Sequence, residues 1–147
     1  MTPEEIKATL GLVPLPHEGG WWTQTHLDGH STAIYYFLEA GECSALHRLQ
    51  HPEIYHWYAG SPLDLLVLHP DGSSSRPVLG PDLSAGQRPQ LTVPPNTWQG
   101  SSPAGAWSLV GTTMAPGYRQ DEFELGDRAT LQAAFPEAAE RIEDLTP

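Results

Sequence analysis

The fold is decided by one stretch in the first half of the chain, residues 41–60, which reads GECSALHRLQHPEIYHWYAG. Its residues are typical of two β-strands joined by a turn at Gln50–Pro52. Residues two apart on a strand face the same side of a sheet, so His47 and Leu49 share one face. Glu53 opens the second strand. We expect this hairpin to bring the His47 imidazole and the Glu53 carboxylate together on the inner side of a β-barrel.

Short apolar runs with a similar strand-like composition continue on both sides of this hairpin. Runs rich in Ile, Val, Thr, Tyr and Trp alternate with turn residues, a pattern typical of β-strands. Many short strands at regular spacing, with helical patterns only at the two ends, indicate an all-β sandwich or barrel. The expected strands are Trp21–Leu27, Thr32–Glu39, Cys43–Leu49, Glu53–Tyr58, Leu63–His69, Ser74–Leu79, Gln90–Val93, Thr97–Ser101, Ala106–Met114 and Arg119–Leu125.

The helical patterns lie outside residues 21–125. Thr2 can cap a helix over residues 3–10, with Glu5 completing a capping box and Gly11 ending it. Asp127 can cap a second helical region over residues 128–144, which Pro136 divides into two helices. A chain of 147 residues has the length of a single domain, so we assign residues 1–147 to one unit with a barrel core at about 21–125.

The charge excludes two classes of partner. Seven Lys and Arg residues stand against 18 Asp and Glu residues, a net charge of −11. Such a surface repels nucleic acid and anionic membranes. The acidic start of the chain does not resemble a signal peptide, and the single cysteine, Cys43, forms no internal disulfide. We therefore predict a cytoplasmic protein that binds a small molecule.

The hairpin stretch resembles the first sequence motif of the cupin superfamily. Gly41, His47, Glu53 and Gly60 fall on its positions, whereas Leu49 stands where a second His is usual. Pro94-Pro95-Asn96-Thr97-Trp98-Gln99 has the spacing of the second motif, with Gln99 in place of its His. The resemblance implies a jelly-roll barrel, the double-stranded β-helix of cupins, with a ligand pocket inside.

The chain is similar, more narrowly, to the small single-domain cupins grouped as cupin family five. This resemblance implies a homodimer and a pocket lined from the barrel strands. The stretches that carry it are Glu18–Trp22, Ser31–Tyr35, His47–Leu49, Glu53–Gly60, Leu79–Leu83, Pro89–Gln90, Val110–Gly111, Ala115–Gly117 and Phe123–Leu125.

One interpretation of the pocket is a metal-free enzyme, similar to the dTDP-sugar epimerases among the cupins. His47 and Glu53 then form an acid–base pair, since an imidazole beside a carboxylate is a usable base. Tyr55 is a candidate acid. The flat side chains of Tyr36, Trp57 and Trp98, with Gln99, are candidate ligand contacts. The reaction would be an isomerisation, epimerisation or lyase step on a sugar-like or small acid ligand.

A second interpretation is a metal site. His47, Glu53 and Gln99 would be its ligands, but an amide oxygen is a much poorer ligand than imidazole for a transition metal. We therefore predict that the pocket holds no tightly bound metal, and we keep a bound divalent ion as the alternative.

A third interpretation is a ligand-binding or storage protein without chemistry, in which the same polar pair only orients a ligand. Glu18-Gly19-Gly20 is interpreted as a tight turn or a dimer contact. It precedes a strand rather than a helix, so it lacks the helix N-terminus that binds phosphate.

Overall fold

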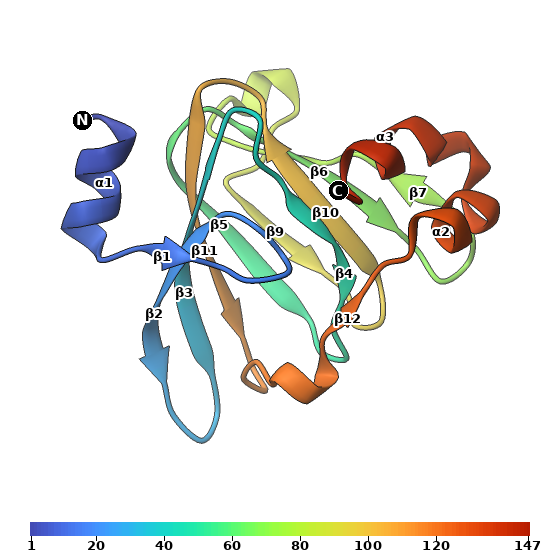
Figure 1. The fold of residues 1–147 in the computed structure, drawn as a ribbon, viewed down its shortest axis with the longest axis horizontal. Helices are drawn as coiled ribbons and strands as arrows, with labels where there is room; N and C mark the ends of the chain where they lie inside the picture. Colours follow the sequence, from blue (N-terminus) through green and yellow to red (C-terminus); the bar gives the residue numbers. More distant parts are fainter.

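Two antiparallel sheets face each other in the computed structural model, which describes residues 1–147. This arrangement confirms the predicted jelly-roll barrel (Figure 1). The first sheet has the strand order β1 (Val13–Pro14), β2 (Trp21–Leu27), β3 (Thr32–Glu39), β11 (Trp107–Met114), β5 (Glu53–Gly60) and β9 (Gln90–Val93). The second has the order β12 (Glu124–Leu125), β4 (Ser44–Arg48), β10 (Trp98–Pro103), β6 (Leu63–Leu68) and β7 (Ser74–Ser75), and β8 (Val78–Leu79) also pairs with β6.

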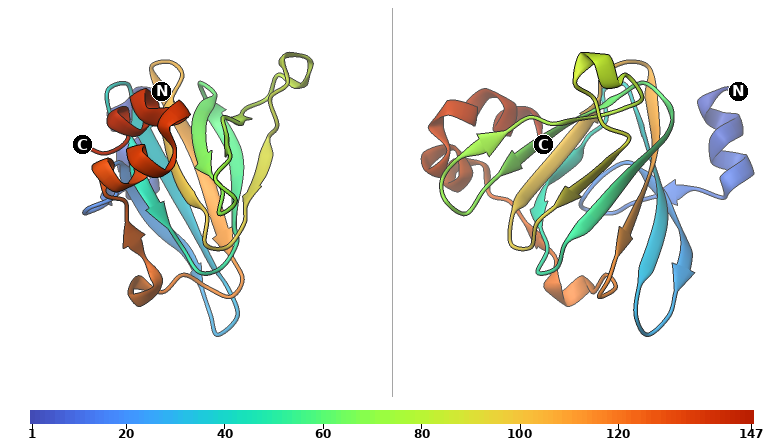
Figure 2. Two further views of the ribbon diagram at one scale, coloured as in Figure 1. Left: turned by 90° about the vertical axis from the view of Figure 1, so that its right-hand side faces the viewer. Right: turned by 180° about the vertical axis from the view of Figure 1, so that it is seen from behind.

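Helices cover the outer face of each sheet at opposite ends of the molecule. Helix α1 (Pro3–Leu10) lies beside the first sheet, and α2 (Arg128–Ala134) and α3 (Ala139–Asp144) lie against the second (Figures 1 and 2). The capping box predicted at Thr2 and Glu5 is present, and Gly11 ends α1 in the left-handed conformation. No helix is both long enough and apolar enough to pass through a bilayer.

Three apolar clusters hold these layers together. The one inside the barrel contains Tyr36, Leu38, Tyr55, Leu63, Leu65, Val67, Leu79, Val93 and Val110. The one between the second sheet and the C-terminal helices contains Leu46, Leu66, Leu68, Leu131, Phe135, Ala138, Ile142 and Leu145. A smaller one under α1 contains Ile6, Leu12 and Phe37. Because both faces of β4 are covered, its residues Ser44 to His47 are all buried.

Two expected strands differ in the structure. The stretch 74–79 is split into β7 and β8, and Pro77, which has no N–H to donate to a ladder, stands between them. The predicted strand Arg119–Leu125 was wrong for most of its length: a 3-10 turn, η2 (Gln120–Glu122), precedes the two-residue β12. This segment therefore crosses from the first sheet to the second as a loop.

A bulge in β4 changes which of its side chains face inward. Gln99 of β10 pairs with His47, and Ser101 pairs with Ser44, so the one residue between these pairs on β10 is opposite two residues on β4. Ser44 and His47 therefore share the inner face although they are three apart. Cys43 packs instead against the cluster under the C-terminal helices.

Candidate functional site

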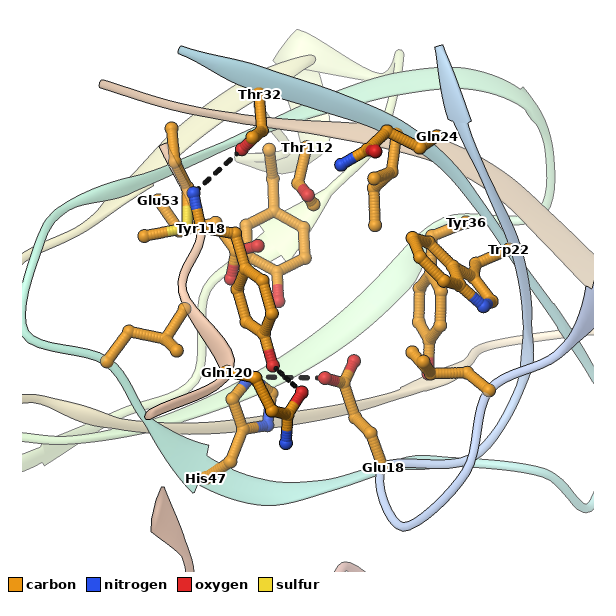
Figure 3. Close-up of a pocket in the computed structure, with 15 residues that line it drawn as sticks. Glu18, Trp22, Gln24, Thr32, Tyr36, His47, Glu53, Thr112, Tyr118 and Gln120 are labelled. Atoms are coloured by element: carbon orange, nitrogen blue, oxygen red, sulfur yellow. Dashed lines mark hydrogen bonds and ion pairs between the residues drawn. The ribbon is translucent and has the colours of Figure 1, made fainter. Parts of the chain in front are cut away.

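A cavity of about 120 Å³ lies between the two sheets, and we call it the chamber. Both predicted acid–base residues, His47 and Glu53, line it. Its other lining residues are Leu15, Glu18, Trp22, Gln24, Thr32, Ile34, Tyr36, Leu49, Tyr55, Thr112, Met114, Tyr118 and Gln120 (Figure 3).

The register of the first sheet builds the wall that carries Glu53. Glu53 pairs with Met114, which pairs with Thr32 on its other side. Residues directly opposite each other in an antiparallel sheet face the same side, so these three side chains form one row across the inner face. The next row contains Tyr55, Thr112 and Ile34. Polar side chains in both rows therefore stand beside the Glu53 carboxyl.

His47 faces these rows from the second sheet, and its orientation is fixed. Its Nδ1 lies 2.7 Å from the Ala45 carbonyl oxygen. A carbonyl oxygen can only accept, so Nδ1 carries a proton and donates it. The Phe123 ring stacks on the imidazole, with 5.2 Å between ring centroids. Nε2 is consequently the nitrogen left for a ligand or a proton.

Glu18 enters the chamber from the loop between β1 and β2. Its Oε1 lies 3.8 Å from His47 Nε2, and its Oε2 accepts a hydrogen bond of 3.1 Å from the Ser44 hydroxyl. The tight conformation of this loop directs the Glu18 side chain into the chamber. Gly20 has φ 76°, and a Cβ there would lie 2.7 Å from the Tyr36 hydroxyl oxygen. Only glycine fits that position without displacing the loop.

Glu53 is buried without a full set of partners. Glu53 is only 8% exposed, and its Oε1 has no hydrogen-bond partner. Burial raises the pKa of the Glu53 carboxyl above its ordinary value, and the nearby Glu18 carboxylate adds to that increase. His47, Thr112 and Gln99 act in the opposite direction. The result is a buried carboxyl whose pKa lies above its ordinary value and which has one oxygen available to a ligand.

A segment that we call the strap, residues 115–123, crosses the open end of the chamber. The Tyr118 amide donates to Thr32 Oγ1 at 2.9 Å, and the Tyr118 hydroxyl donates to Gln120 Oε1 at 2.7 Å (Figure 3). Burial, followed by the charges of Glu18 and Glu53, raises the pKa of Tyr118 to about 12, so it stays a donor.

A wider depression of about 410 Å³ lies outside the strap, and we call it the vestibule. Chamber and vestibule share Leu15, Glu18, Trp22, Tyr118 and Gln120. The two spaces are therefore adjacent, with Glu18 and the Tyr118–Gln120 pair at their boundary.

Three other predicted site residues lie at or next to the chamber. Tyr36 and Tyr55 line it. Gln99 is buried beside it, and its Oε1 accepts a 2.5 Å hydrogen bond from the Tyr55 hydroxyl. Burial, followed by the charges of Glu53 and Glu18, raises the pKa of Tyr55 well above its ordinary value. Tyr55 is therefore poorly suited to act as an acid, and its proton already serves Gln99.

The two predicted tryptophan contacts lie away from the chamber. Trp57 packs against the barrel cluster, and its indole donates to the Ser61 carbonyl oxygen at 3.2 Å. Trp98 lies on the outer side of the second sheet, against the cluster under the C-terminal helices, with the Arg48 guanidinium 4.5 Å from its ring centroid. Trp22, which was not predicted, is the tryptophan that lines the chamber.

The donor atoms do not fit a transition metal. No group of three or more His, Cys, Asp and Glu side chains lies close enough together to hold an ion. Of the predicted ligands, Gln99 already uses its oxygen to accept from Tyr55, and Leu49 occupies the place of a second imidazole. One imidazole and scattered carboxylates do not make a metal centre of the usual cupin composition.

Sequence reasoning missed Glu18 and the strap. Two adjacent glycines after Glu18 were a signal for a close approach of the loop to other backbone. The residues that this loop approaches are distant in sequence, so the direction of the Glu18 side chain followed only from the three-dimensional structure. Tyr118 and Gln120 were not among the candidates, and residues 119–123 of the strap were interpreted as part of a strand.

The jelly-roll sheets and the chamber between them define a cupin. The chain belongs to the family described as "Cupin superfamily (DUF985)", whose model matches residues 4–126. No curated protein matches the sequence.

Solved structures agree with this assignment. The chain is 30% identical to protein SO0799 from Shewanella oneidensis, with a TM-score of 0.92 over 100% of this chain and 98% of that one. It is 27% identical to a hypothetical protein from Leishmania major, with a TM-score of 0.91 over 99% of each chain. A dTDP sugar isomerase from Desulfovibrio desulfuricans is similar in fold at 18% identity, with a TM-score of 0.57 over 79% of each chain.

Proposed function

We propose that the protein is a metal-independent isomerase or epimerase that moves protons on a small ligand in the chamber. One observation carries the proposal. An imidazole with a fixed tautomer and a buried carboxyl with an unpartnered oxygen line the same cavity of about 120 Å³. A pair of groups whose surroundings favour opposite roles is the usual arrangement for acid–base catalysis.

The roles follow from the surroundings of each group. His47 Nε2 accepts a proton from a carbon next to a ligand carbonyl, while the protonated Glu53 donates its proton to the carbonyl oxygen. The ligand becomes a neutral enediol. For an isomer, the His47 imidazolium returns its proton to the former carbonyl carbon while the hydroxyl of the neighbouring carbon gives its proton to the Glu53 carboxylate. For an epimer, a proton from solvent reaches the original carbon on its other face, the enol hydroxyl returns its proton to Glu53, and the imidazolium releases its own proton to solvent. Glu18, 3.8 Å from Nε2, stabilises the imidazolium that forms.

The fold is compatible with such chemistry, because a dTDP sugar isomerase is built on it. Similarity of fold does not transfer a reaction, so the proposal depends on the chamber residues. A lyase step with the same base is the variant of this mechanism in which the intermediate loses a leaving group.

Deuterium uptake tests the proposal. Small hydroxy-aldehydes and hydroxy-ketones are incubated with the protein in D2O, and NMR follows exchange of the hydrogen next to the carbonyl. We expect exchange above the protein-free rate, reduced about 10²–10⁴-fold in His47→Gln and Glu53→Gln. The exposed Glu140→Gln is the matched control and keeps full activity. Equal rates in all variants, or no exchange with any compound, would contradict it.

A second candidate function is ligand binding without turnover. It is favoured by the strap, which the hydrogen bond from the Tyr118 amide to Thr32 Oγ1 ties to the chamber wall and which would slow ligand release. Tight binding of a compound that shows no exchange would select this function.

A further inference from the structure

We infer that the chamber selects a hydroxyl-bearing group of about six non-hydrogen atoms without negative charge, and that it excludes carboxylates and phosphates. The inference rests on the proposed function in using the same chamber, and it decides between the sugar-like and the acidic ligands that the sequence left open.

The charges that face the chamber are the first argument. Two acidic side chains, Glu18 and Glu53, line it, together with one imidazole, and the Glu18 carboxylate carries the negative charge that a ligand meets even when Glu53 holds its proton. None of the seven Lys and Arg residues lines the chamber or the vestibule. Arg119, which lies on the strap, is exposed and paired with Asp121 and Glu122. An anionic ligand would therefore meet like charge without any guanidinium or ammonium group to compensate.

The hydrogen-bonding groups are the second argument. Glu53 Oε1 is buried and has no partner, so it favours a ligand that brings a hydroxyl to it. Side-chain amides of Gln24 and Gln120 and the hydroxyls of Thr32 and Thr112 surround the same space. Such groups both donate and accept, which matches a polyhydroxy compound better than a carboxylate, which only accepts.

The shape of the lining is the third argument. Leu15, Ile34, Leu49, Met114 and Trp22 give the chamber apolar surface beside its polar groups. A polyol presents C–H faces and O–H edges, and it can satisfy both kinds of wall. The volume of about 120 Å³ is slightly below the cavity of about 150 Å³ that accommodates benzene, so about six non-hydrogen atoms fit inside. A larger ligand would keep its remainder in the vestibule.

Three compounds with the same three-carbon skeleton separate the alternatives. Glycerol is neutral, glycerate is anionic, and serinol is cationic. Each is titrated to tens of millimolar into ¹⁵N-labelled protein, with the Trp22 indole and the His47 and Tyr55 amides as reporters. We expect glycerol to shift these signals and glycerate to bind at least about tenfold more weakly, because like charges a few ångströms apart repel strongly in a poorly solvated site. Serinol should bind more tightly than glycerate, because its ammonium group meets acidic side chains.

A pair of variants then tests whether Glu18 causes the selectivity between glycerol and glycerate. Glu18→Gln should narrow the difference between glycerol and glycerate several-fold, whereas Glu140→Gln should leave it unchanged. The comparison of the three compounds on the wild-type protein tests the inference even if Glu18→Gln folds poorly. Glycerate binding as tightly as glycerol or serinol, or no response to any of the three, would overturn the inference. If selectivity holds but no ligand exchanges deuterium, the proposed reaction fails and this inference stands.

Discussion

Replacement of Glu53 by Gln should stabilise the protein increasingly as the pH rises. The residue is 8% exposed and its Oε1 has no hydrogen-bond partner. Burial raises the pKa of its carboxyl above 4.5, so the folded state holds the proton at pH values where the unfolded chain has released it. The unfolding free energy of the wild type therefore falls as the pH rises above about 4.5, until the folded carboxyl itself ionises.

The size of this effect follows from the same burial. At high pH, each unit by which the pKa of Glu53 is raised lowers the free energy of unfolding by about 1.4 kcal/mol. An unsatisfied buried polar atom lowers it by about 1–3 kcal/mol. Gln has nearly the same shape and no charge. We expect Glu53→Gln to be more stable than the wild type by about 1–3 kcal/mol at pH 8, with a smaller difference at pH 4.

Urea denaturation at intervals between pH 4 and pH 8 measures the difference, with Glu140→Gln as the matched exposed control. The control should follow the wild type at every pH. A Glu53→Gln difference that is constant with pH, or a variant less stable than the wild type at pH 8, would refute the assignment of Glu53 as a buried carboxyl with a raised pKa.

Three further predictions concern the scaffold that positions the chamber. Gly20→Ala should cost about 2–4 kcal/mol from positive φ and overpacking, because its Cβ would lie 2.7 Å from neighbouring atoms; Gly41→Ala, at φ 88° with open space, should cost only about 1–2 kcal/mol. Equal losses in urea denaturation would argue against the close approach of the Glu18 loop. Ile142→Ala, at a site that is fully buried, should cost about 2–5 kcal/mol, whereas Leu125→Ala, 49% exposed, should change stability by less than about 0.5 kcal/mol; similar thermal shifts would contradict the assigned packing of the C-terminal helices. Tyr118→Phe should leave global stability within about 1 kcal/mol but speed amide hydrogen exchange in residues 115–123, and unchanged exchange there would mean that the hydroxyl does not hold the strap.

The barrel could be predicted from the sequence because its signals are local. Strand alternation and turn residues located most elements within a residue or two, and Thr2, Glu5 and Gly11 marked α1 at both ends. Asn96 shows why the second motif kept its turn despite lacking a glycine: its φ is 55°, a conformation that asparagine tolerates.

The convergence of His47 and Glu53 was predicted, but not by the geometry that produces it. The two residues lie on consecutive strands, yet β4 and β5 belong to different sheets and do not pair, so the side chains face each other across the barrel instead of standing side by side on a hairpin. Both line the chamber.

The rest of the site depends on contacts between distant segments. Glu18 reaches His47 across 29 positions of sequence, and no periodicity in the loop indicates that direction. The bulge in β4 moved Ser44 to the inner face, which strict alternation excludes. Strand-like composition at 119–125 concealed the strap, because tertiary pairing rather than propensity decides the structure of so short a segment.

A crystal structure of the protein soaked with a neutral polyol tests the central claim most directly. The account predicts the polyol inside the chamber, with one hydroxyl within about 3 Å of Glu53 Oε1 and a carbon or hydroxyl facing His47 Nε2. A chamber that takes up glycerate from an equal mixture with glycerol, or a polyol bound only in the vestibule, would contradict it.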